Sequence, residues 1–311
     1  MIKKKYLPAM ILCALGAISS LSVQAAQDIR VTYAGSMGVV MDKYLGPTFA
    51  KNEHAAYQGQ GQGAYGMAHL LESKKVVADV FVSITPGPMD ILKQAGLVDE
   101  AVPVASTSMV ITYNPKSTFA PAFEAIKNAK PGAAPWWKVL ESPGLKFGRT
   151  DPINDPQGQN IIFTMLLAEK YYQQPGLTHK VLGDVQNPQQ VFAEGGLLTR
   201  MEAGQVDAAS GYESATISSK LPYITLPDEI NLSNPAMTKD WYSKVSFKVT
   251  DSKGQEKTLQ TQPLVFYAAV LKNAPDAALG RKFIAFLQSP AGQAELKKNG
   301  YGQPKGGVLY Q

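Results

Sequence analysis

The stretch Asp28-Ile29-Arg30-Val31-Thr32-Tyr33-Ala34-Gly35-Ser36 decides the fold class of this 311-residue chain. Residues 28–34 are rich in β-branched and aromatic side chains and predict a strand, which Gly35-Ser36 ends. Apolar and aromatic side chains then recur at helical spacing, at Met37, Val40, Met41 and Tyr44. The segment is therefore predicted to be a strand that turns directly into a helix.

The same strand-to-helix order repeats along the chain. A strand around Ala56-Tyr57 leads through the glycine-rich segment 58–66 into a second amphipathic helix. Residues 78–83 form a short, buried type of strand, and Pro88 stands near the start of the helix that follows. Repeated β-α-β order predicts the α/β class, with mostly parallel sheets flanked by helices.

Two apolar strands, 108–114 and 263–271, enclose a second α/β block. The simplest topology has the chain leave one lobe, build another and return, with these segments as paired crossover strands. This predicts a first lobe of residues 27–109 and 271–311 and a second lobe of residues 110–270. The chain length also suits two lobes better than a single core.

The first 26 residues have the pattern of an export signal. Three lysines, Lys3 to Lys5, precede an apolar run that is too short for a stable membrane span, and Val23-Gln24-Ala25 supplies a small-residue cleavage site. The single cysteine, Cys13, lies inside this segment. The mature protein is therefore expected to lack thiols, which excludes disulfides, cysteine nucleophiles and cysteine-based zinc sites.

The charge pattern argues against a nucleic-acid partner. The formal net charge is +5, and it falls to about +2 once the three lysines of the leading segment are removed. No basic run exceeds Lys74-Lys75 or Lys297-Lys298, whereas a nucleic-acid binder would concentrate positive charge on one face. No second apolar stretch approaches the length of a membrane helix.

Four predicted helix starts carry small or polar residues. Free backbone N–H groups and the positive end of the helix dipole make such starts suitable for an anion. Two fall in each lobe: Gly35-Ser36 and Gly61-Gln62-Gly63-Ala64 in the first, Asp155-Pro156-Gln157-Gly158 and Ser210-Gly211-Tyr212 in the second. Together they predict a small-anion site between the lobes, although each alone could be an ordinary helix cap, loop or turn.

A secreted serine hydrolase is the alternative from another class. Ala34-Gly35-Ser36-Met37-Gly38 is similar to a nucleophile elbow between a strand and a helix. That fold orders its triad as serine, acid and histidine, but the last histidine here, His179, precedes more than a third of the chain. The scattered histidines indicate no metal cluster, and the glycine-rich segment lacks the Lys-Ser/Thr ending of a nucleotide-binding loop.

Several segments resemble the molybdate/tungstate-binding proteins of ABC importers, the archaeal-type branch especially. The likeness is carried by Tyr33–Ser36, Ala78–Val80, Phe147–Gly158 and Tyr223–Leu232, and the tail Gln288–Gln293 is similar to solute-binding proteins generally. The resemblance implies a two-lobed type II periplasmic-binding fold and a periplasmic, non-enzymatic monomer without a cofactor. It also implies an oxyanion ligand held in the cleft, and a permease and an ATPase as partners.

The resemblance also assigns site residues. Ser36 matches the family's first ligand-contacting serine, Gln62 stands where the second would be, and Asp155 matches a carboxylate that ligates the metal of the oxyanion. The family's other carboxylate falls on Gly211, so Glu213 is the nearest acid, and both four- and six-coordinate binding stay open. The expected ligand-binding set is Gly35, Ser36, Gln62, Gly63, Ala64, Gln157, Gly158, Tyr212 and Glu213, with Asp155 on molybdenum or tungsten. A carrier of sulfate or another small anion remains the alternative within transport.

Overall fold

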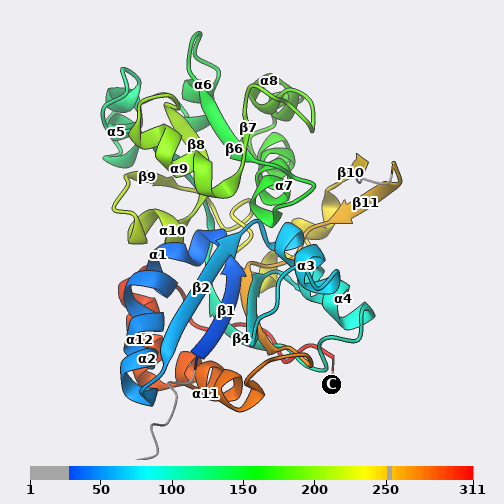
Figure 1. The fold of residues 1–311 in the computed structure, drawn as a ribbon. Helices are drawn as coiled ribbons and strands as arrows, with labels where there is room; N and C mark the ends of the chain where they lie inside the picture. Colours follow the sequence, from blue (N-terminus) through cyan, green and yellow to red (C-terminus); the bar gives the residue numbers. More distant parts are fainter. Residues whose placement is uncertain (1–27, 251–253, 311) are drawn as a thin grey trace, which may run out of the picture.

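The computed structural model describes residues 28–250 and 254–310, which fold into two α/β lobes joined by paired crossover segments (Figure 1). This confirms the predicted fold class. The expected export signal, 1–26, lies outside the described residues. No helix among the described residues is long and apolar enough to cross a membrane.

The first lobe is built on a five-stranded sheet of order β2-β1-β3-β12-β4. Four strands run parallel, and β12 runs antiparallel to its neighbours β3 and β4. The strands are β1 (Asp28–Ala34), β2 (Ala56–Gln62), β3 (Val80–Ile84), β4 (Val102–Ser106) and β12 (Val265–Val270). The helices are η1 (Gly35–Met37), α1 (Gly38–Val40), η2 (Met41–Leu45), α2 (Gly46–Glu53), α3 (Ala64–Glu72), α4 (Pro86–Gln94), α11 (Ala277–Gln288) and α12 (Pro290–Lys298).

The second lobe repeats this plan in the order β7-β6-β8-β5-β9, with β5 antiparallel to β8 and β9. Its strands are β5 (Met109–Tyr113), β6 (Phe147–Thr150), β7 (Val191–Phe192), β8 (Ala208–Tyr212) and β9 (Tyr223–Thr225). Its helices are α5 (Ala120–Lys127), α6 (Trp136–Leu140), α7 (Pro156–Tyr171), α8 (Leu177–Leu182), α9 (Glu194–Glu202) and α10 (Glu213–Ser218). The return path contains η3 (Pro235–Met237), η4 (Tyr242–Lys244) and a projecting hairpin of β10 (Ser246–Thr250) and β11 (Glu256–Gln260) (Figure 1).

Each crossover strand is the antiparallel strand of the lobe that it enters. The chain leaves β4, passes through Thr107 and Ser108, and starts β5 in the second sheet. It returns through Leu264, whose carbonyl accepts a hydrogen bond of 3.2 Å from the Thr107 N–H, so the two crossovers are side by side. The expected end of the second lobe at residue 270 is wrong, because β12 pairs within the first sheet. A continuously apolar strand does not reveal which of two sheets it joins.

Buried polar groups fix the first strand against its neighbours. Asp79, fully buried, accepts hydrogen bonds from the Arg30 N–H at 2.8 Å and from the Asp276 N–H at 2.6 Å. Asp276 in turn caps α11 through the Leu279 N–H. These bonds tie β1 and the start of α11 to the residue before β3, and they satisfy a carboxylate that would be costly to bury unpaired.

Candidate functional site

The turn after β1 lies at the boundary between the lobes. Gly35 and Ser36 form the η1 turn, which contacts α9 and α10 of the second lobe. The Tyr301 hydroxyl, from the C-terminal tail, donates a hydrogen bond of 3.4 Å to the Ser36 carbonyl. Behind the turn, the Tyr33 hydroxyl donates to Asp42 Oδ1 at 2.6 Å, and burial raises the pKa of Tyr33. The Gly35-Ser36 turn is therefore bonded to Tyr301, follows a strand residue that is fixed by Asp42, and faces the other lobe.

The glycine-rich turn after β2 packs against η1. A Cβ atom at Gly61 would lie 2.5 Å from the Tyr33 ring and 3.3 Å from the Gly35 Cα, so only glycine allows the two turns to approach this closely. Gln62 ends β2, Gly63 precedes α3, and Ala64 begins it. The first two predicted helix starts are thus neighbours.

The start of α7 provides the third group. Asp155 Oδ1 caps the helix by accepting a hydrogen bond of 3.0 Å from the Gln157 N–H, and Pro156 occupies the first helical turn. A Cβ atom at Gly158 would lie 2.4 Å from the Thr150 carbonyl oxygen, which explains the glycine. The Gln157 side chain donates to the Ser210 carbonyl at 3.1 Å and so connects α7 to the end of β8.

The second carboxylate oxygen of Asp155 is the unusual atom of this site. Asp155 is buried, with 4% of its surface exposed. Burial raises the pKa of its carboxyl to about 6, and the Gln157 N–H offsets part of that rise. The Thr150 hydroxyl also lowers this pKa, but neither that hydroxyl nor Asp155 Oδ2 makes a hydrogen bond of ordinary geometry within the described residues. The Ser210 hydroxyl is likewise buried without such a bond there.

Tyr212 and Glu213 point in different directions from the end of β8. The Tyr212 hydroxyl is fully buried and accepts a hydrogen bond of 3.0 Å from the Asn160 side chain of α7. The Glu213 carboxylate accepts hydrogen bonds from the Ser108 hydroxyl at 2.7 Å and from the Tyr223 hydroxyl at 3.2 Å. Glu213 is therefore bound to the crossover and to β9, and both of its oxygens have partners that Asp155 does not share.

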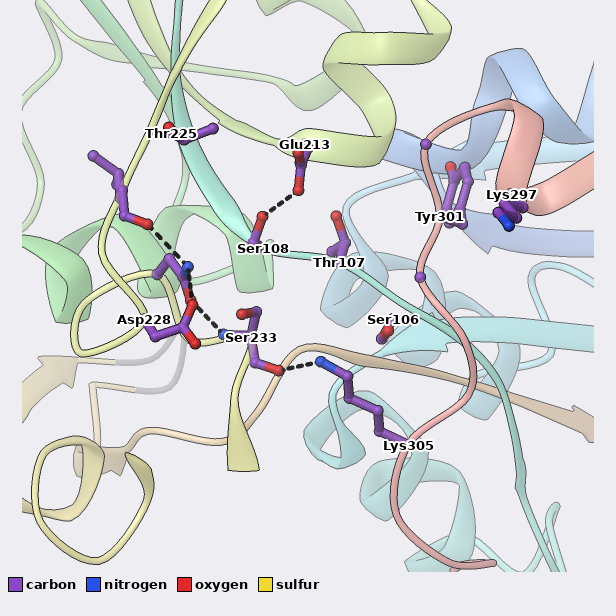
Figure 2. A pocket seen from close by; sticks show the side chains of 14 residues that line it. Ser106, Thr107, Ser108, Glu213, Thr225, Asp228, Ser233, Lys297, Tyr301 and Lys305 are labelled. Carbon is purple, nitrogen blue, oxygen red and sulfur yellow. Dashed lines mark hydrogen bonds between the residues drawn. The ribbon is translucent and has the colours of Figure 1, made fainter. Parts of the chain in front are cut away.

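Figure 2 shows the groove that Glu213 lines, which follows the first crossover segment and has a volume of about 500 Å³. Polar groups in its wall bind one another. The Ser106 hydroxyl donates to the Gln303 carbonyl, Thr107 accepts from the Ser214 hydroxyl, and the Lys305 ammonium donates to the Ser233 carbonyl at 2.6 Å. These hydrogen bonds connect the first crossover segment and the C-terminal tail to the second lobe. Among its lining residues the sequence singled out only Glu213 as a site residue, because a groove formed by segments far apart in the chain has no local signal.

The four predicted helix starts therefore meet at one place. The η1 turn contacts β2 and α10, Gly63 lies against Asp155, and Gln157 reaches Ser210. Within the described residues, no group of three or more His, Cys, Asp or Glu side chains could hold a metal ion. The arrangement places buried hydroxyls and one buried carboxylate oxygen, Asp155 Oδ2, where the two lobes meet.

Comparison with known proteins agrees with this architecture. The model of the bacterial extracellular solute-binding protein family matches residues 29–302. A molybdate/tungstate-binding protein of Pyrococcus abyssi, WtpA, is 28% identical over 315 aligned residues, which cover 93% of this chain and 88% of that protein.

Solved structures show the same fold at low identity. The periplasmic molybdate-binding protein of Azotobacter vinelandii has a TM-score of 0.63 and 17% identity, and covers 89% of this chain and 100% of its own. The sulfate-binding protein SubI of Mycobacterium tuberculosis has a TM-score of 0.59 and 14% identity, and covers 88% of this chain and 86% of its own. With a family model that matches most of its length and with these two lobes, the chain belongs to the bacterial extracellular solute-binding proteins.

Proposed function

We propose that this protein captures molybdate or tungstate between its lobes and delivers the anion to an ABC permease. The name of the Pyrococcus abyssi relative supports this ligand class. The meeting of helix starts from both lobes supports an anion as ligand, since the N-terminal end of each helix carries the positive end of the helix dipole. In this proposal Ser36, the backbone at 62–64 and Tyr212 donate hydrogen bonds.

The observation that carries the proposal is the buried Asp155 Oδ2, which makes no hydrogen bond of ordinary geometry within the described residues. A carboxylate next to a sulfate or phosphate dianion repels it unless a proton is shared between them. Molybdenum and tungsten can accept an additional oxygen ligand, which sulfur in sulfate cannot. Asp155 Oδ2 would then ligate the metal, while Oδ1 continues to cap α7.

A sulfate carrier is the second candidate, and the pKa of Asp155 favours it at acidic pH. Below a pKa of about 6 the carboxyl is protonated, and it could then donate a hydrogen bond to sulfate in place of repelling it. The hydroxyl and N–H donors of the site would serve either anion.

Transport rather than catalysis fits the surroundings of Ser36. All three histidines, His54, His69 and His179, are exposed, so none of them is a buried base next to the Ser36 hydroxyl. We therefore propose a non-enzymatic, exported monomer whose partners are the oxyanion, a permease and an ATPase.

The deciding experiment is calorimetric titration with molybdate, tungstate and sulfate at pH 8, where the Asp155 carboxyl is ionised. We expect binding of both metal oxyanions and much weaker binding of sulfate. Equal or tighter binding of sulfate at this pH would favour the second candidate. A chromogenic ester assay on the same sample should show no turnover.

A further inference from the structure

A side chain at Gly63 would collide with residues of the second lobe. The Gly63 backbone has φ −50° and ψ 124°, which any residue adopts without strain. The three atoms nearest to a Cβ at this position all belong to the second lobe. They are the Asn154 carbonyl oxygen at 2.7 Å, the Asp155 Cβ at 3.2 Å and the Asn154 carbonyl carbon at 3.3 Å. Nothing in the first lobe would be closer.

The turn that follows Gly63 makes a hydrogen bond to the same residue. The Gly66 N–H, in the first turn of α3, donates to the Asn154 carbonyl oxygen at 3.1 Å. N–H groups in a first helical turn have no partner within their own helix, so this one is available to the other lobe. Between the two glycines, burial raises the pKa of Tyr65 to about 12, and a side-chain hydrogen bond with Gln159 of α7 partly offsets that rise.

We propose that residues 63–66 form a closing contact, and that the absence of a side chain at Gly63 sets how closely the lobes can approach. The contact is made on Asn154, the residue before Asp155, so closing also places the Asp155 carboxylate. The inference rests on the proposed function only in taking a ligand as one means of closing the lobes.

The energetic consequence follows from the population of the closed state. A ligand that binds between closed lobes has an apparent affinity reduced by the fraction of molecules that can close. A methyl group at residue 63 would press on a backbone carbonyl, which cannot rotate away as a flexible side chain can. Alanine at this position therefore disfavours closing while leaving the first lobe unstrained.

The test measures closing directly with two spin labels, one on each lobe. Lys75→Cys and Lys180→Cys are suitable positions because both side chains are exposed, and Cys13 is expected to leave with the export signal. The distance between labels is recorded in buffer, in saturating tungstate, and in concentrated sucrose. Sucrose is excluded from protein surfaces and favours the more compact state without binding the site.

Both tungstate and sucrose should shorten the label distance in the otherwise wild-type protein. In Gly63→Ala the distance should stay long in sucrose, and tungstate affinity should fall at least about tenfold. Gly63→Ser should behave alike, because it carries the same Cβ while its hydroxyl can still cap α3. Gly307→Ala is the matched control, since nothing lies within 4 Å of its added Cβ, and it should close as the wild type does.

The possible outcomes separate the two proposals. Gly63→Ala that closes to the wild-type distance in sucrose would overturn the closing contact, whatever the anion does. A label distance that is the same in buffer, tungstate and sucrose, for the wild type and for every variant, would overturn the closing contact as well. If sucrose closes the wild-type protein, no anion closes it, and Gly63→Ala stays open in sucrose, the closing contact is supported and the proposed ligand is contradicted. Weaker binding by Gly63→Ala at an unchanged bound distance would mean that the methyl group touches the ligand instead.

Discussion

The Ser108 hydroxyl, on the segment that joins the lobes, donates a hydrogen bond of 2.7 Å to Oε2 of Glu213. Tyr223 donates to the other oxygen of the same carboxylate. The resemblance to molybdate/tungstate-binding proteins implies a second carboxylate at the position of Gly211, and Glu213 is the nearest acid in the sequence. Its two hydrogen bonds instead connect it to the segment between the lobes and to β9.

Glu213→Gln tests that connection. The amide oxygen of glutamine can still accept a hydrogen bond from Ser108, so the crossover segment should keep its geometry. Tungstate affinity should change by less than about threefold, within the net worth of one neutral hydrogen bond. Calorimetric titration beside Asp155→Asn checks this, and a loss as large as that of Asp155→Asn would make Glu213 a ligand.

Asp155→Asn separates coordination of the metal from helix capping. Asparagine caps a helix about as well as aspartate, so α7 should keep its start. A neutral oxygen is a weaker donor to the metal, hence tungstate affinity should fall. Sulfate binding should rise, because the repulsion between two anions is removed. Paired titrations at fixed salt decide the matter, since parallel changes for both anions exclude a ligand role.

The stability of the anion-free protein should depend on pH through Asp155. Folding raises the pKa of this carboxyl from 3.8 to about 6, so the folded state binds its proton more tightly than the unfolded state. Stability is therefore lost as pH rises from about 4 to about 6, by up to about 3 kcal/mol, and is constant above that range. Urea unfolding of wild type and Asp155→Asn between pH 4 and 8 measures the difference. Identical pH profiles would show that Asp155 does not titrate with a raised pKa.

Ser36→Ala tests the first predicted contact. The η1 turn has no side-chain cap, so removing the hydroxyl should leave the turn intact. Anion binding should weaken by about 1.5–3 kcal/mol, the usual worth of a hydrogen bond to a charged group. Unchanged affinity in calorimetry, with an unchanged melting temperature, would return Ser36 to a structural role.

The fold could be predicted from the sequence because its signals are local. The strand 28–34 and the helix starts at Gly35 and Pro156 depend on neighbouring residues, through β-propensity, glycine and proline geometry, and capping. The sheet that β12 joins depends on contacts almost 200 residues away in sequence, such as its pairing with β3. A uniformly apolar strand fits either sheet equally well, so its lobe was placed wrongly.

The candidate site divides in the same way. Asp155, Gln157 and Gly158 have local reasons for their residue types, and the sequence pattern indicated them. The different surroundings of Glu213 and Asp155 depend on the path of the crossover, because Ser108 lies far from Glu213 in the sequence. The reason for Gly63 lies entirely in the other lobe, so no pattern within its own segment could reveal it.

The position of β12 has a consequence for how the protein is made. Among the strands of the first sheet β4 pairs with β12 alone, and of the described strands β12 is the last to be synthesised. When residues 28–106 have been synthesised, the first sheet still lacks β12, and β4 has no neighbouring strand to pair with. Such long-range pairing delays folding, because the loop between the partners must close first. The sheet of the first lobe can therefore become complete only after the second lobe and β12 have been synthesised.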